Sequence, residues 1–148
     1  MKIKILLLLP IAALSACTAS REPLLQNTPV KFTEAHNYFL RQGQSLPQLS
    51  KITSSESFGQ AFGAATTMGE EGRPTPIDFD RLFALCIVLP ATDRETRIIP
   101  HEISDSSQQL CIKYHVEMGE RQSYTMQPLC ILLVDKKYER REVILIKK

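Results

Sequence analysis

The middle of the chain contains an unbroken run of apolar residues from Leu82 to Leu89. A strand with one solvated face alternates apolar and polar residues, whereas an unbroken run of this length is typical of a strand buried on both faces. The pattern therefore predicts a central strand, in a sheet that a helix or a second sheet covers.

Residues 110–118 show the other pattern, a strict alternation. One face of the predicted strand is apolar or aromatic, and the opposite face is mostly polar: Leu110, Ile112, Tyr114, Val116 and Met118 against Cys111, Lys113, His115 and Glu117. Because successive side chains of a strand point to opposite faces, this pattern predicts a half-exposed strand of an antiparallel sheet.

Shorter strand-like segments flank these two strands. They cover residues 30–35, 37–41, 45–52 (weakened by Pro47), 96–103, 129–136 and 142–148, with a turn or bulge expected at His36-Asn37. Two polar stretches predict connections. ATDRETR, residues 91–97, is expected to be a solvated turn, and DKKYERR, residues 135–141, a hairpin loop between the last two strands.

A single helix is predicted after Thr53. Thr53 precedes Glu56 by three residues, which is the spacing of a capping box. The helix that follows places four apolar side chains on one face, at i, i+3, i+4 and i+7: Phe58, Ala61, Phe62 and Ala65. Plain core packing is the expected role of the two phenylalanines.

The next segment, Thr66–Pro76, contains two glycines and two prolines and is predicted to be a loop. It is longer than most connections in compact domains. We therefore treat it as a candidate interaction surface.

Together these patterns predict an α+β fold that is mostly β: an antiparallel sheet or sandwich with one short helix. Residues 30–148 are expected to form a single β-rich domain. Residues 18–29 contain two prolines and no periodicity, so we expect them to be a flexible tether.

The N-terminus has the composition of a secretory signal. Lys2 and Lys4 precede an apolar stretch, Ile5–Leu14, which is too short to span a bilayer. The sequence Leu-Ser-Ala-Cys that ends at Cys17 resembles the lipobox of bacterial lipoproteins. An ordinary signal peptide with a chance cysteine is the alternative.

The lipobox resemblance implies a specific maturation. Residues 1–16 would be removed as a signal peptide, the Cys17 thiol would carry a diacylglycerol, and the new amino group would be acylated. Several acyl chains anchor a protein stably, whereas one does not. The implied location is the cell envelope, and Thr18, which stands where an inner-membrane retention signal has Asp, favours the outer membrane.

Charge argues against nucleic acid as a partner. The chain has 18 basic and 16 acidic residues, and Lys2 and Lys4 lie in the predicted signal peptide, so residues 17–148 carry 16 of each sign. There is no basic tract of the kind that binds phosphate backbones.

Three cysteines remain beside Cys17: Cys86, Cys111 and Cys130. They are either small buried hydrophobes or include one disulfide, and the sequence does not choose the pair.

The sequence shows no arrangement typical of catalysis. Its three histidines are His36, His101 and His115, and there is no Gly-x-Ser-x-Gly motif. Cys111 and His115 share a strand face, but four residues of strand separate them by roughly 13 Å. We therefore expect a protein that is not an enzyme.

Metal and cofactor motifs are likewise missing from the sequence. There is no Cys-x-x-Cys and no His-x-x-x-His pair. Asp78 and Asp80 lack the glycine of a calcium loop. We expect Asp78 to cap the turn into the central strand and Asp80 to meet solvent, with no metal and no cofactor bound.

One polar and aromatic stretch, Glu120–Pro128, is predicted to lie between two strands. Its Tyr124 and Met126 are candidate partner contacts, because Tyr and Met are enriched at interfaces. The alternative is that they form the inward side of the next strand.

Three features in sequence order carry a further resemblance: the helical stretch SSESFGQAF, the segment Pro76–Asp80, and the apolar strand FALCIVLP. With the strands that follow, Lys51–Lys148 resembles the C-terminal domain of the protease complex subunit PrcB family. The resemblance implies a non-catalytic accessory protein that binds and stabilises an envelope protease, and it carries over no site residues.

The sequence thus favours a lipid-anchored binding or accessory module of the envelope with a protein partner. The alternative is a lipoprotein that binds a small ligand or a glycan on its sheet, as in adhesion.

Overall fold

The computed structural model describes residues 27–106 and 108–148. The predicted signal peptide and Cys17 lie outside these residues, as does most of the predicted tether. Two segments form short 3₁₀ turns, Glu70–Gly72 and Lys136–Tyr138. The regular elements are β1 Thr28–Val30, β2 Phe32–Ala35, β3 Tyr38–Leu40, β4 Leu49–Ile52, α1 Ser55–Ala61, β5 Phe62–Ala64, β6 Leu82–Val88, β7 Thr92–Ser106, β8 Gln109–Met126, β9 Leu129–Asp135 and β10 Glu142–Lys147. Among the described residues, no helix is long and apolar enough to cross a membrane.

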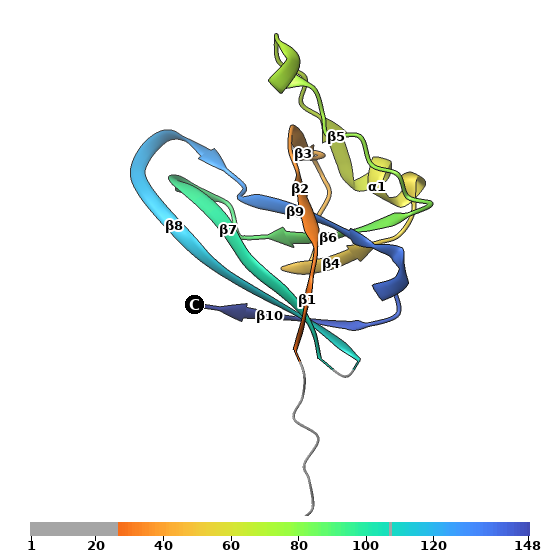
Figure 1. Ribbon diagram of the computed structural model, residues 1–148. Helices are drawn as coiled ribbons and strands as arrows, with labels where there is room; N and C mark the ends of the chain where they lie inside the picture. Colours follow the sequence, from red (N-terminus) through yellow and green to blue (C-terminus); the bar gives the residue numbers. More distant parts are fainter. Residues whose placement is uncertain (1–26, 107) are drawn as a thin grey trace, which may run out of the picture.

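The strands form two four-stranded sheets and one small hairpin (Figure 1). The outer sheet has the order β1-β7-β8-β10, and the central sheet has the order β2-β9-β6-β4; β3 and β5 pair separately. All pairs are antiparallel except β8–β10. The predicted class, a mostly β sandwich with one short helix, is confirmed.

The central sheet is covered on both faces, as the run Leu82–Leu89 predicts. Alternate β6 side chains, Phe83, Leu85 and Ile87, pack in one core cluster with apolar residues of the outer sheet. The intervening Ala84 and Cys86 pack in a second cluster with α1 and its neighbours. A second sheet and a helix therefore cover β6 together, one on each face.

The helix is shorter than predicted and begins differently. The N-cap is Ser54, whose hydroxyl accepts a hydrogen bond from the Ser57 backbone N–H at 3.2 Å, so the predicted cap at Thr53 is wrong by one residue. The helix ends at Ala61, and Phe62 already belongs to β5. Phe58 and Phe62 are both buried in the core, as predicted.

Two expectations about loops are wrong because β7 and β8 are long. ATDRETR is not a turn, since Thr92–Arg97 is the first part of β7. Likewise, most of Glu120–Pro128 does not lie between strands, because β8 runs on to Met126. The two strands pair with each other here although most of their side chains are exposed, so the apolar pattern that would reveal them is weak.

The predicted hairpin between the last two strands is also wrong. β9 already pairs with β2 on one edge and β6 on the other, so β10 has no free edge of β9 to pair with. The chain instead turns through Lys136–Tyr138 and crosses to the outer sheet, where β10 runs parallel to the start of β8.

The cysteines outside the signal region are free thiols. Cys86 and Cys130 lie on neighbouring strands but belong to core clusters on opposite faces of the central sheet, which explains why they do not form a bridge. Burial raises the pKa of each of these two thiols to about 12; for Cys130 the nearby Glu34 adds to the effect. Both act as small core residues.

Asp78 has the predicted capping role. Its carboxylate accepts a hydrogen bond from the Asp80 backbone N–H at 3.0 Å, and its carbonyl accepts from Arg81 and Leu82 at the start of β6. Asp80 is exposed, as expected.

Candidate functional site

A groove opens where the chain passes from one sheet to the other. β1 pairs with β7 in the outer sheet, and β2 then turns away to pair with β9 in the central sheet. Beyond this point β2 and β7 diverge (Figure 1). The groove between them has a volume of about 560 Å³, and its lining includes residues 96–100 of β7 together with Phe32, Glu34, His36, Met126 and Leu129.

Both walls of the groove are strand edges that no other described strand covers. β1 pairs with β7 only at Ile103–Asp105, so the same edge of β7 is free over Thr92–Glu102. β2 pairs with β9 alone, which leaves its other edge free as well. Unpaired edges present a row of backbone donors and acceptors to any chain that can reach them.

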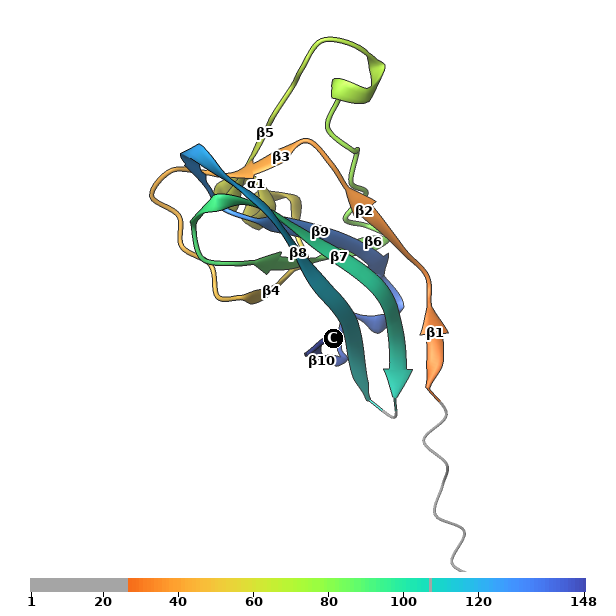
Figure 2. The same cartoon turned by 90° about the vertical axis from the view of Figure 1, so that its left-hand side faces the viewer.

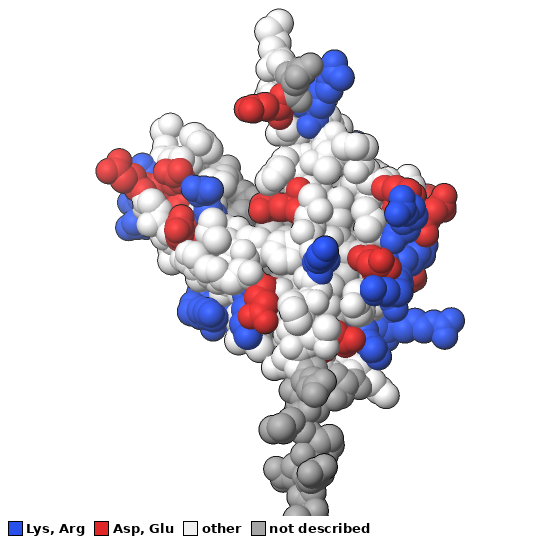
Figure 3. Space-filling model, viewed as in Figure 1, with Lys and Arg blue, Asp and Glu red and all other residues white. Residues whose placement is uncertain are grey.

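The outer wall of the groove is a projecting two-stranded ribbon, which we call the arm: residues 92–99 of β7 and 115–126 of β8. It projects to the left of β2 and β9 in the first view (Figure 1) and lies in front of β6 and β9 when that side is turned toward the viewer (Figure 2). β10 covers the other edge of β8 only as far as Tyr114, so the arm is unpaired on that side too. The space-filling view shows a hollow between the arm and the rest of the molecule (Figure 3).

The two candidate contact residues both lie on the arm. Tyr124 is exposed, at 61% of its surface, and Met126 is half-buried in the lining of the groove. Neither belongs to the strand that follows. Met118, which the alternation places on the inner face of β8, is instead 67% exposed because the arm has left the sandwich by this point.

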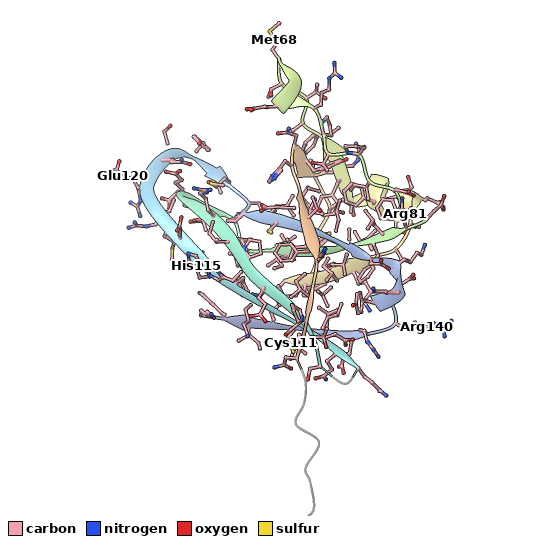
Figure 4. All side chains as sticks on the ribbon, viewed as in Figure 1. Met68, Arg81, Cys111, His115, Glu120 and Arg140 are labelled. Carbon is pink, nitrogen blue, oxygen red and sulfur yellow. The ribbon has the colours of Figure 1, made fainter. Side chains whose placement is uncertain are left out.

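The Thr66–Pro76 loop rises at the same end of the molecule (Figure 1). Asn37 holds it, because its side-chain amide donates to the carbonyls of Glu71 and Arg73 at 2.7 and 2.9 Å. Asn37 itself has φ of 63°, which Asn tolerates better than most residues, and this confirms the predicted turn at His36-Asn37. Met68 is fully exposed at the tip (Figure 4).

The structure separates the three histidines into two places. His36 lines the groove, whereas His101 and His115 meet on the outer sheet. The Nε2 atom of His101 lies 2.5 Å from Nδ1 of His115, and Nε2 of His115 lies 3.3 Å from a carboxylate oxygen of Glu117. Cys111 lies four residues before His115 on β8 and is not among the contacts of this cluster.

Sequence reasoning missed this cluster because the contact depends on register. Ile99 is the direct partner of His115, and a bulge between Pro100 and Glu102 inserts His101 as an extra residue. The only signal in the sequence is a pair of histidines on two predicted strands that follow one another along the chain.

The described residues hold no group of three or more His, Cys, Asp or Glu side chains arranged for a metal ion. The groove itself offers exposed backbone groups, one carboxylate, one guanidinium and an imidazole beside apolar surface.

Comparison with protein-family models, curated proteins and solved structures finds no match for this chain. The resemblance to the PrcB family and to bacterial lipoproteins therefore stays a prediction from the sequence.

Proposed function

We propose that this protein is a lipid-anchored binding module of the cell envelope, which holds an extended segment of a partner protein in the groove between β2 and β7. The observation that carries the proposal is the pair of unpaired strand edges, of β2 and of β7, that border the same groove. The free edge of β7 continues directly from the part that β1 occupies, so a guest strand antiparallel to β7 would extend the ladder that β1 begins.

Strand addition supplies affinity through main-chain hydrogen bonds, and pockets for alternate side chains supply selectivity. Phe32, Met126 and Leu129 offer apolar surface to one set of guest side chains. Glu34 and Arg97 offer charges of both signs to other guest side chains.

The position of the groove fits a tethered protein. The described chain starts at Asn27, at the lower end of the molecule, and the arm and the Thr66–Pro76 loop lie at the opposite end (Figure 1). A domain held through a lipid on Cys17 would then present the groove away from the membrane. The accessory role that the PrcB resemblance implies, binding an envelope protease, is one form of this proposal.

Site-specific photo-crosslinking in the native envelope tests the binding face. A crosslinker placed at Met126 or Tyr124 is expected to capture one dominant protein. A matched crosslinker at Gln60, exposed on α1 away from the groove, is expected not to capture it. Equal capture from all three positions, or none from the groove, would contradict the proposal.

The small-ligand alternative has one observation in its favour, because 560 Å³ lies within the usual range of ligand pockets. It predicts a small molecule or sugar that copurifies with the protein and raises its melting temperature. Binding of such a ligand that is lost in Met126→Asp, without any protein crosslink, would replace the peptide proposal with this one.

The anchor has its own test. Cys17→Ser is expected to block lipidation and leave an unprocessed precursor, which gel mobility and metabolic labelling with fatty acid would show. Normal mature, membrane-bound protein from this variant would refute the lipobox interpretation.

A further inference from the structure

A pair of histidines stands on the exposed face of the outer sheet, away from the groove. His115 lies on β8 (Figure 4), and the bulge in β7 brings His101 beside it. The ring planes are tilted by only 16°, and the ring centroids are 4.6 Å apart while the nearest nitrogens are 2.5 Å apart. The two nitrogens in contact therefore lie between the two ring centres, so that each ring points one nitrogen toward the other ring.

The contact with Glu117 assigns the tautomer of His115. The Nε2 atom faces the Glu117 carboxylate, which can only accept a hydrogen bond when ionised, so Nε2 carries the proton. The Nδ1 atom, which faces His101, then presents its lone pair. A carboxylate behind the far nitrogen of an imidazole is the usual second partner of histidines that bind metal ions, because it fixes the tautomer and raises the basicity of the ligand.

We infer that His101 and His115 chelate one divalent transition-metal ion, with Glu117 as the carboxylate that orients His115. Without metal, one proton on His101 Nε2 joins the two rings. The metal ion takes the place of that proton, which moves by way of solvent to Nδ1 of His101, so both nitrogens become ligands and both rings stay neutral. Water completes the coordination, since both side chains are accessible from outside.

The distances favour metals that bind their ligands at right angles. With metal–nitrogen bonds of about 2.0–2.1 Å, two nitrogens at a right angle are about 2.9 Å apart, and a tetrahedral pair about 3.3 Å apart. The observed 2.5 Å needs the smaller adjustment for the right-angle geometry, which Ni²⁺ and Cu²⁺ prefer and Zn²⁺ does not. Rotation of two accessible rings can supply it.

The charged side chains around the pair balance in sign. Glu117 adds negative charge, and its cross-strand partner is Arg97. The nearest lysine on the same face, Lys113, is paired with Glu102 at 3.0 Å.

Titration calorimetry with Ni²⁺ tests the inference, because this ion does not oxidise the free cysteines. The chain is purified without a histidine tag. We expect one Ni²⁺ per chain and a rise in melting temperature on adding the ion. His101→Gln and His115→Gln should each weaken binding by about tenfold or more, and Glu117→Gln by about tenfold.

His36→Gln is the matched control, since it changes the remaining histidine of the chain and leaves the pair intact. It should bind Ni²⁺ like wild type. The double variant of His101 and His115 measures any binding by the rest of the chain, and circular dichroism confirms that each variant is folded. Equal affinity of wild type and the folded double variant, or equal loss in His36→Gln, would overturn the inference.

Discussion

The central pair of strands, β6 and β9, and the arm formed by β7 and β8 are both antiparallel ribbons, but their surroundings are opposite. β6 and β9 are paired on both edges and covered on both faces, so nearly all their side chains are buried. The arm has two free edges, and most of its side chains are exposed. The first pair is held by burial of apolar surface, and the second mainly by its own ladder of hydrogen bonds.

The difference separates stability from recognition. A strand pair with no free edge and no exposed face has nothing left to offer a partner. The arm offers backbone groups and the exposed side chains of Met118 and Tyr124. Substitutions at the exposed positions of the arm should therefore affect the core little.

The largest expected effect is in the centre. Leu85→Ala removes a fully buried side chain of β6 from the cluster between the sheets and should lower the free energy of unfolding by about 2–5 kcal/mol. Urea titration followed by circular dichroism measures the loss. Met118→Ala, an apolar side chain of the arm, is the matched control and should change stability little; equal losses would mean that the arm is packed as the centre is.

The two buried thiols of the central sheet predict that the free energy of unfolding falls at alkaline pH. The pKa of Cys86 and of Cys130 is raised from 9.0 to about 12 in the folded chain. Between these values the unfolded chain has lost protons that the folded chain keeps, so stability falls as pH rises, by about 1.4 kcal/mol per pH unit for each thiol. Below pH 9 the two thiols contribute no pH dependence.

Denaturant titrations from pH 8 to 11 measure this slope. Cys86→Ala should make the slope shallower, whatever its effect on stability at pH 8. Cys111→Ala is the control, as Cys111 is not in the core, and an unchanged slope in Cys86→Ala would contradict the burial argument.

The same contrast explains which parts of the fold the sequence predicts. The run Leu82–Leu89 and the alternation from Leu110 were sufficient for β6 and for the first half of β8, because burial imposes those patterns. ATDRETR has the composition of a turn because strands whose faces are exposed need no regular alternation of apolar residues. The hairpin assigned to residues 135–141 failed for a different reason: strand order depends on which edges are free, and no local pattern records that β9 is already paired on both sides.

The sites depend on such non-local facts even more. Tyr124 and Met126 could be chosen as contact residues by type, but the groove beside Met126 exists only because β1 and β2 join different sheets. The histidine pair depends on a bulge of a single residue at His101. A one-residue change of register would move a neighbouring side chain to the other face.

A smaller effect is expected from the ion pair across the arm. Arg121 Nε lies 2.9 Å from Asp93 Oδ2, and both side chains are largely exposed. A double-mutant cycle with Asp93→Ala and Arg121→Ala should give a coupling free energy of about 0.2–1 kcal/mol that shrinks in high salt. A coupling well above this range that resists salt would show that the arm is shielded from solvent.

The smallest effect on stability is expected where the effect on binding is largest. Tyr114 and Tyr124 are the same residue type on one strand, yet Tyr114 is 2% exposed, with its hydroxyl accepting from Gln48 at 3.0 Å, and Tyr124 is 61% exposed. Tyr124→Ala should change the free energy of unfolding by less than about 0.5 kcal/mol, whereas Tyr114→Ala should lower it by an amount like that of Leu85→Ala, about 2–5 kcal/mol. If the arm is the recognition surface, Tyr124→Ala abolishes the crosslink from Met126 in a protein as stable as wild type. Loss of stability in Tyr124→Ala would mean that Tyr124 packs as part of the fold. An undiminished crosslink would mean that Tyr124 does not contribute to binding, which would then rest on the backbone edges alone.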